Sequence, residues 1–126
     1  MSTKIPEGYQ TVTPYLVIPN AAGFIAFTQD VFNATLVNKF MRDDESLIMH
    51  GEIKIGDSVI MFADSTEQYA PQPAGFFIYV ENADKVYERA LEKGAAAVTK
   101  ISDQSYGRSG GVKDAFGNTW WITSVI

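Results

Sequence analysis

Two side chains with acid–base chemistry stand two residues apart, His50 and Glu52, and His50 is the only histidine of the chain. Alternate residues of a β-strand point to the same face, so a strand here would bring the imidazole close to the carboxylate. An imidazole with an ordinary pKa of about 6.5 suits a general base. We therefore take His50 and Glu52 as candidate catalytic residues. The alternative is that both are polar residues lining a wet cleft.

A metal held by His50 and Glu52 alone would be under-coordinated, because zinc sites use about three protein ligands or more. Arg108, which follows Tyr106 and Gly107, is a candidate of a different kind. Its guanidinium could hold a carboxylate or phosphonate in a bidentate manner. An equally good interpretation is a surface ion pair with Asp103 or Asp114.

Trp120 and Trp121 are adjacent, so on a strand they face opposite ways. We expect one ring in the core and the Trp121 ring in a cleft, where it could stack on a planar ligand. Methionine suits loose recognition of varied ligands. The candidate ligand-binding residues are Thr13, Tyr15, Met61, Phe77, Tyr79, Tyr106, Arg108 and Trp121. The alternatives are a dimer interface for this group and a core between modules for both tryptophans.

The elements that must position these residues follow from hydrophobic periodicity and from helix and turn signals. Asn20 and Asn82 can cap helices, and Asn33 and Gly94 can end them in the left-handed conformation. The expected strands are 12–18, 36–42, 47–55, 58–63, 76–80, 96–101, 110–113 and 118–125, and the expected helices are 21–32 and 83–93. Residues 102–107 are expected to form a polar loop.

In four of the expected strands, one set of alternate residues is the more uniformly apolar, and we assign this set to the side covered by a helix. These sets are Leu16/Ile18, Ile60/Phe62, Phe76/Ile78/Val80 and Trp120/Ile122. The opposite sets mix aromatic and polar groups, among them Thr13 and Tyr15, His50 and Glu52. A curved sheet with such a face is typical of a small-molecule cleft.

The chain repeats itself: residues 33–40 are echoed by residues 94–101, and the flanking segments repeat as well. Two copies are too few for a solenoid, but they can pack together and share a concave surface. We expect one domain over residues 1–126, with a first module at about 10–64, a linker at about 65–74 and a second module at about 75–126. The predicted class is α+β, with two tandem βαβββ modules.

Bulk composition narrows the function. A net charge of −5 without a Lys/Arg cluster argues against a nucleic-acid partner. No cysteine is present, which excludes thiol nucleophiles and mildly favours a reducing compartment. The first residues lack the apolar core of a signal peptide, and no apolar stretch reaches the length of a membrane span. We expect a cytoplasmic protein with no membrane partner.

Three segments resemble the vicinal oxygen chelate superfamily, which includes glyoxalase I, extradiol dioxygenases and bleomycin- and fosfomycin-resistance proteins. They are residues 13–18, residues 50–61, and residues 106–108 with 114–120. Together they look like its PhnB-like (3-demethylubiquinone methyltransferase-like) branch. The resemblance implies a glyoxalase-like curved mixed sheet with a cleft, and a homodimer, since relatives often pair.

The resemblance also implies where a divalent metal would bind, and this chain departs from the pattern at all four positions. They hold Thr13, Met61, Gly75 and Trp121, none of which is a good ligand for a hard divalent ion. We therefore expect no metal and no other cofactor. The favoured function is binding of a small, planar or aromatic molecule, with sequestration as one use. The alternatives are a lyase or dioxygenase type of enzyme using His50 and Glu52, with or without a metal, and a fold that serves assembly alone.

Overall fold

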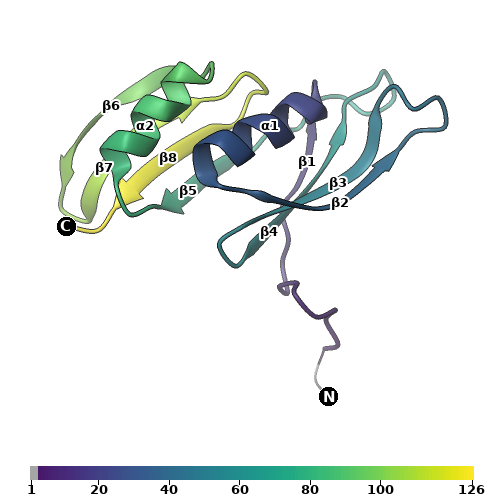
Figure 1. Cartoon of the computed structure of the whole chain (residues 1–126), viewed down its shortest axis with the longest axis horizontal. Coiled ribbons are helices and arrows are strands. Elements are labelled where there is room, and N and C mark those ends of the chain that lie inside the picture. Colours follow the sequence, from purple (N-terminus) through teal and green to yellow (C-terminus); the bar gives the residue numbers. More distant parts are fainter. Residues whose placement is uncertain (1–2) are drawn as a thin grey trace. The chain divides into compact units, whose positions relative to one another are not determined.

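The computed structural model describes residues 3–126, which form two helices and eight strands (Figure 1). In chain order they are β1 (Tyr15–Ile18), α1 (Ala21–Phe32), β2 (Thr35–Met41), β3 (Ile48–Ile55), β4 (Ser58–Asp64), β5 (Gly75–Tyr79), α2 (Ala83–Glu92), β6 (Ala96–Gln104), β7 (Gly107–Lys113) and β8 (Thr119–Ser124). Neither helix in this range has the length and apolar character needed to cross a membrane.

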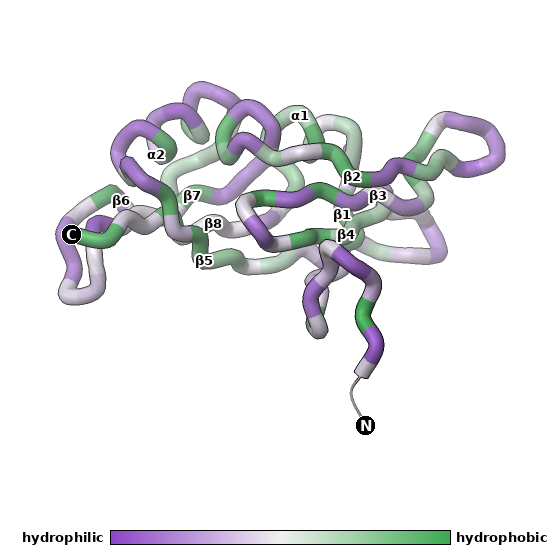
Figure 2. The backbone as a smooth tube through the Cα atoms, turned by 60° about the horizontal axis from the view of Figure 1, so that its bottom comes forward, coloured by the Kyte–Doolittle hydropathy of each residue, from purple (hydrophilic) through white to green (hydrophobic). Residues whose placement is uncertain are grey.

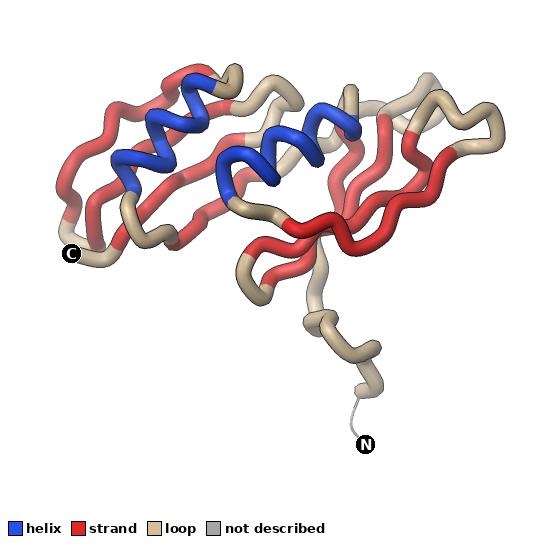
Figure 3. Tube along the Cα trace, in the orientation of Figure 1, coloured by secondary structure: helices blue, strands red, loops and turns tan. Residues whose placement is uncertain are grey.

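The strands form two four-stranded mixed sheets, in the orders β1-β4-β3-β2 and β5-β8-β7-β6. In each sheet the first pair is parallel and the other two are antiparallel. The chain divides into two compact units between Gln72 and Pro73. Figure 3 shows the same succession of strand, helix and three strands in each unit. The predicted α+β class with two tandem βαβββ modules is confirmed.

In the first unit, α1 begins and ends at asparagines in the left-handed conformation. The side chain of Asn20 accepts a hydrogen bond from Gly23 N at 3.1 Å, and Asn33 ends the helix at φ 57°. The carboxylate of Asp64 also accepts the first helical N–H, that of Ala21, at 2.7 Å. These groups satisfy backbone donors that would otherwise be unpaired at a helix start.

In the second unit, α2 is amphipathic, and Figure 2 shows it turning between hydrophobic and hydrophilic residues. Asn82 accepts from Lys85 N at 3.1 Å, as the sequence predicts for its cap. Tyr87 is buried and lies over Gly110 of β7, where an added Cβ would come within 3.0 Å of the ring. Glycine at this position therefore lets α2 approach its sheet closely.

The side of each sheet covered by its helix is the one that the apolar alternation predicts. Phe24 of α1 packs edge-on against Phe62 at a ring-centroid distance of 5.2 Å. In β8, Trp120 is 1% exposed and stacks on Phe76 at 4.3 Å, whereas Trp121 is 37% exposed. The two tryptophans thus face opposite ways, with Trp120 on the helix side.

The expected polar loop at residues 102–107 is wrong. β6 continues to Gln104 and β7 begins at Gly107, with Asp103 paired to Arg108 across a tight hairpin. Polar side chains are tolerated here because β6 is an edge strand whose residues are mostly exposed. The polar composition therefore predicts a loop where the structure has strand residues. Residue 72, in the expected linker, also forms an isolated bridge with Val17.

Asp114 organises the turn between β7 and β8 and generates a test of this fold. Its carboxylate is 5% exposed and accepts from Phe116 N, Asn118 N, Asn118 Nδ2 and Trp120 Nε1 at 2.8–3.0 Å. We expect Asp114→Ala to lower the free energy of unfolding by about 3 kcal/mol, because several buried donors lose their acceptor. Urea unfolding followed by circular dichroism measures this loss.

The matched control is Asp103→Ala, which removes a carboxylate whose side chain is 70% exposed. We expect this control to cost less than about 1 kcal/mol, as is usual for exposed ion pairs. Equal losses in the two variants would contradict the role given to Asp114.

Candidate functional site

The first sheet has an open face, which is the face that α1 does not cover. Cross-strand pairing sets a row of side chains across it, because Tyr15 pairs with Met61, Met61 with Glu52, and Glu52 with Asn38. His50 lies on the same face, next to Glu52 along β3. The structure thus brings together four residues that the sequence indicated, Tyr15, His50, Glu52 and Met61.

Glu52 is the centre of a hydrogen-bond network on this face. The residue is 6% exposed, and its Oε2 lies 2.7 Å from Nε2 of His50. Its Oε1 accepts from Asn38 Nδ2 at 3.1 Å and from the hydroxyl of Tyr9. Burial raises the pKa of Glu52, but the hydrogen bonds from Tyr9, His50 and Asn38 outweigh it and leave the pKa below its ordinary value.

Both ring nitrogens of His50 have partners. A carboxylate only accepts hydrogen bonds, so Nε2 must carry the hydrogen that it shares with Glu52. In the neutral ring, Nδ1 then accepts from the hydroxyl of Tyr15, 3.1 Å away. Aromatic rings flank the imidazole, with centroids 5.5 Å away for Tyr15 and 6.3 Å away for Phe40. The carboxylate therefore orients the imidazole, as in sites that use histidine as a base.

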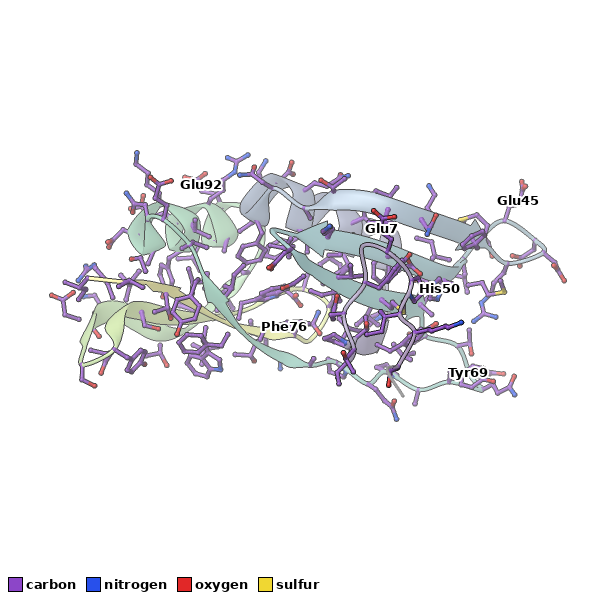
Figure 4. The ribbon with its side chains drawn as sticks, turned by 90° about the horizontal axis from the view of Figure 1, so that it is seen from below. Glu7, Glu45, His50, Tyr69, Phe76 and Glu92 are labelled. Carbon is purple, nitrogen blue, oxygen red and sulfur yellow. The ribbon has the colours of Figure 1, made fainter. Side chains whose placement is uncertain are left out.

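Sequence reasoning missed Tyr9 and Asn38. Tyr9 comes from the segment before β1, and its partner Glu52 is 43 positions away in sequence. Figure 4 shows the segment that carries Glu7 passing over the side of the sheet where His50 lies. No local pattern predicts such a contact. Asn38 did carry a signal, because it is a polar residue in the middle of an expected strand.

The open face of the second sheet carries large exposed aromatic side chains, Phe77, Tyr79, Tyr106 and Trp121, which we call the aromatic surface. Phe77 lies across the strand pair from Trp121 and has its ring centroid 5.3 Å from Tyr79 and 6.0 Å from Tyr106. The Trp121 ring lies over Gly111, where an added Cβ would be 2.5 Å from the ring. The second open face is thus aromatic where the first is polar.

The structure does not bring Arg108 to the aromatic surface. Its guanidinium donates to both carboxylate oxygens of Asp84 on α2, at 2.7 and 3.0 Å, and to Asp103 at 3.0 Å. Hydrogen bonds to Asp84 and Asp103 raise the pKa of Arg108, and the hydrogen bond from Arg108 lowers the pKa of Asp84. The ion-pair alternative is therefore the one present, with Asp84 in place of Asp114.

The positions implied for a metal do not fit one. Thr13, Met61, Gly75 and Trp121 would offer a hydroxyl, a thioether, no side chain and an indole covering Gly111. Divalent ions of this kind prefer carboxylate and imidazole ligands. Among residues 3–126, no three His, Asp or Glu side chains are grouped so that they could hold a metal ion. We derive no chemical step through a metal.

Comparison with known proteins agrees with this arrangement of strands and helices. The family model of the Glyoxalase/Bleomycin resistance protein/Dioxygenase superfamily matches residues 10–122. The chain belongs to this superfamily. An uncharacterized protein of Mycobacterium bovis is 31% identical over 127 residues, covering 91% of this chain and 83% of that protein. An uncharacterized protein of Mycobacterium tuberculosis has the same identity, with 74% of its own length covered.

Solved structures show the same fold at low sequence identity. TioX from a Micromonospora species has a TM-score of 0.71 at 19% identity, covering 93% of this chain and 97% of its own. A putative 3-demethylubiquinone-9 3-methyltransferase, PhnB protein, from Bacillus cereus has a TM-score of 0.73 at 18% identity, covering 92% and 100%. The fosfomycin resistance protein FosX from Listeria monocytogenes has a TM-score of 0.66 at 18% identity, covering 93% and 92%. The expected likeness to PhnB-like proteins is confirmed.

The network around Glu52 leads to a prediction about stability and pH. Because folding lowers the pKa of Glu52, its contribution is complete above its unfolded pKa of about 4.5 and is lost as the pH falls through the lower folded value. We expect Glu52→Gln to cost about 1–3 kcal/mol at pH 7. The difference in the free energy of unfolding between Glu52→Gln and the unchanged protein should shrink below about pH 4.5.

Urea unfolding at several pH values between 7 and 3 checks this expectation. The matched control is Glu92→Gln at the exposed end of α2, labelled in Figure 4, which should change stability by less than about 0.5 kcal/mol. A Glu52→Gln difference that stays constant down to pH 3 would contradict the assigned network.

Proposed function

We propose that this protein is a small-molecule-binding member of its superfamily that holds a planar or aromatic ligand against the aromatic surface. One observation carries the proposal: the indole of Trp121 is on the open face and partly exposed, next to the exposed ring of Phe77. Exposed large aromatic groups gathered in one patch are typical of binding sites.

The chemistry of the aromatic surface suits a flat ligand. Offset or edge-to-face contacts between rings add about 0.5–1.5 kcal/mol each beyond the burial of area. The hydroxyls of Tyr79 and Tyr106 and the N–H of Trp121 could orient polar groups of such a ligand. Within the first unit, we propose Thr13, Tyr15 and Met61 as ligand-binding residues.

The residues Thr13, Met61, Gly75 and Trp121 are poor metal ligands. The proposal therefore uses no metal. Sequestration of a ligand needs affinity without turnover, which an aromatic surface can supply. The names of the superfamily and of one similar structure refer to resistance to bleomycin and fosfomycin. Sequestration of a toxic molecule is the use that we propose.

A homodimer is part of this proposal. Four large aromatic side chains on one sheet face would be shielded from water if a second copy completed the binding site. Light scattering coupled to size-exclusion chromatography measures the mass in solution. A mass of one chain at every concentration would contradict this part of the proposal.

A second candidate function rests on the geometry of His50. Its Nε2 is fixed by Glu52 at 2.7 Å, and its Nδ1 faces the hydroxyl of Tyr15 at 3.1 Å. In this alternative the hydroxyl of Tyr15 passes a substrate proton to Nδ1, and Glu52 stabilises the imidazolium that forms. The reaction class is removal of a proton from a weak acid. Loss of turnover in His50→Ala with ligand binding unchanged would favour this candidate.

The binding proposal predicts a specific loss in Trp121→Ala. In a thermal-shift screen of planar aromatic compounds, a true ligand raises the melting temperature, since it binds the native state alone. We expect Trp121→Ala to weaken the binding of such a ligand about tenfold, because the ligand loses the indole on which it stacks. Fluorescence or calorimetric titration measures the dissociation constant.

The matched control is Tyr69→Ala, which removes another exposed aromatic residue, labelled in Figure 4 and located in the segment between β4 and β5. The control should bind as tightly as the unchanged protein. Equal affinity in all three proteins would contradict the assignment of the aromatic surface.

A further inference from the structure

The hydroxyl of Tyr9 donates a hydrogen bond to Oε1 of Glu52, although Tyr9 belongs to no helix or strand. We call residues 4–13 the N-terminal strap; they precede β1 and run over the open face of the first sheet (Figure 4). Most of the strap is exposed, while Tyr9, Gln10 and Thr13 are half-buried. A side chain of the protein's own strap thus lies in the hydrogen-bond network described above.

The strap is attached to the sheet by side chains. Besides the contact of Tyr9 with Glu52, the side-chain amide of Gln10 donates to Val59 O at 2.7 Å and accepts from Val59 N at 3.2 Å. Gln10 thereby contacts β4 ahead of the point where β1 begins. Within residues 4–13, the backbone–backbone bond is local, from Tyr9 N to Pro6 O. The pairing of β1 with β4 begins at Tyr15, so it does not include residues 4–13.

Lifting the strap would change the state of Glu52. Its Oε1 would keep the hydrogen bond from Asn38 and lose the one from the Tyr9 hydroxyl. Loss of one of the three donors to a nearly buried carboxylate is unfavourable, so the vacated position favours a ligand group that donates a hydrogen bond. Glu52 also raises the pKa of Tyr9, so the phenol that occupies the position keeps its proton and donates.

The occupant itself indicates the ligand class. A phenol already fits at this position, and the rings of Tyr15 and Phe40 flank His50 beside it. We propose that Glu52 is the acceptor of a binding site for small phenols and that Tyr9 is an internal competitor, displaced when the strap lifts. This site is on the first sheet and does not depend on the aromatic surface of the second.

The probes are para-cresol, which is the side chain of tyrosine as a free molecule, and toluene, which lacks the hydroxyl. Ligand-observed NMR titration measures the binding of both to the unchanged protein and to Tyr9→Ala. A site closed by its own strap most of the time has its apparent affinity reduced by the open fraction. We expect Tyr9→Ala to bind para-cresol about tenfold more tightly, and toluene to gain much less.

A second set of variants separates the carboxylate from the strap. Adding Glu52→Gln to Tyr9→Ala should remove most of the gain, because the charge-assisted hydrogen bond is lost. Gln10→Ala, which loosens the strap without touching the phenol position, should give a smaller gain. Tyr69→Ala should give none.

Folding of each variant is checked by circular dichroism before titration. If Tyr9→Ala does not fold, Tyr9→Phe decides, because it keeps the ring and removes the hydroxyl that competes. Para-cresol affinity equal in the unchanged protein and in the folded Tyr9 variant would overturn the proposal. So would a gain that survives Glu52→Gln. Because Trp121 lies on the other sheet, binding lost only in Trp121→Ala bears on the proposed function and not on this site.

Discussion

Within residues 3–126, each sheet is covered by a single helix, and this constraint decides where the remaining polar and aromatic side chains can lie. Alternate side chains of a strand point to opposite faces, so a helix can bury only half of them. Phe62 beneath α1 and Trp120 in β8 are on the buried side. Their neighbours Met61 and Trp121 are left on the open side. The glutamate network and the aromatic surface therefore lie where the helices cannot cover the strands.

Three carboxylates are buried, those of Glu52, Asp64 and Asp114, and they differ in the kind of group that donates to them. Asp64 accepts the backbone N–H groups of Ala21 and Ile48, both at 2.7 Å, and Asp114 accepts two backbone N–H groups of its own turn together with two side chains. Backbone donors cannot leave without unfolding their element. Glu52, on the open face, is satisfied by side chains alone, and one of them belongs to the strap. This difference makes Glu52, rather than the two aspartates, an acceptor that can exchange partners.

Local signals carried most of the fold prediction. The caps at Asn20 and Asn82 place both helix starts, and the period of two assigns the strand faces without knowledge of the pairing. Contacts between distant residues could not be predicted, because nothing near Tyr9 specifies Glu52 and nothing near Arg108 selects Asp84. The hairpin of β6 and β7 was missed for a different reason: an edge strand accepts polar residues that composition alone assigns to a loop.

The two copies have diverged in a way that the sequence repeat hides. The β3–β4 turn has two residues, 56 and 57, whereas the β7–β8 turn spans residues 114–118. If the two copies are aligned on their turn glycines, Val59 corresponds to Trp120. If they are aligned by strand pairing in the two sheets, Met61 corresponds to Trp121 and Glu52 corresponds to Gly111. The indole can lie flat only because residue 111 has no side chain. A glutamate there would exclude the ring, so one sheet face could not hold both arrangements, and each copy carries one of them.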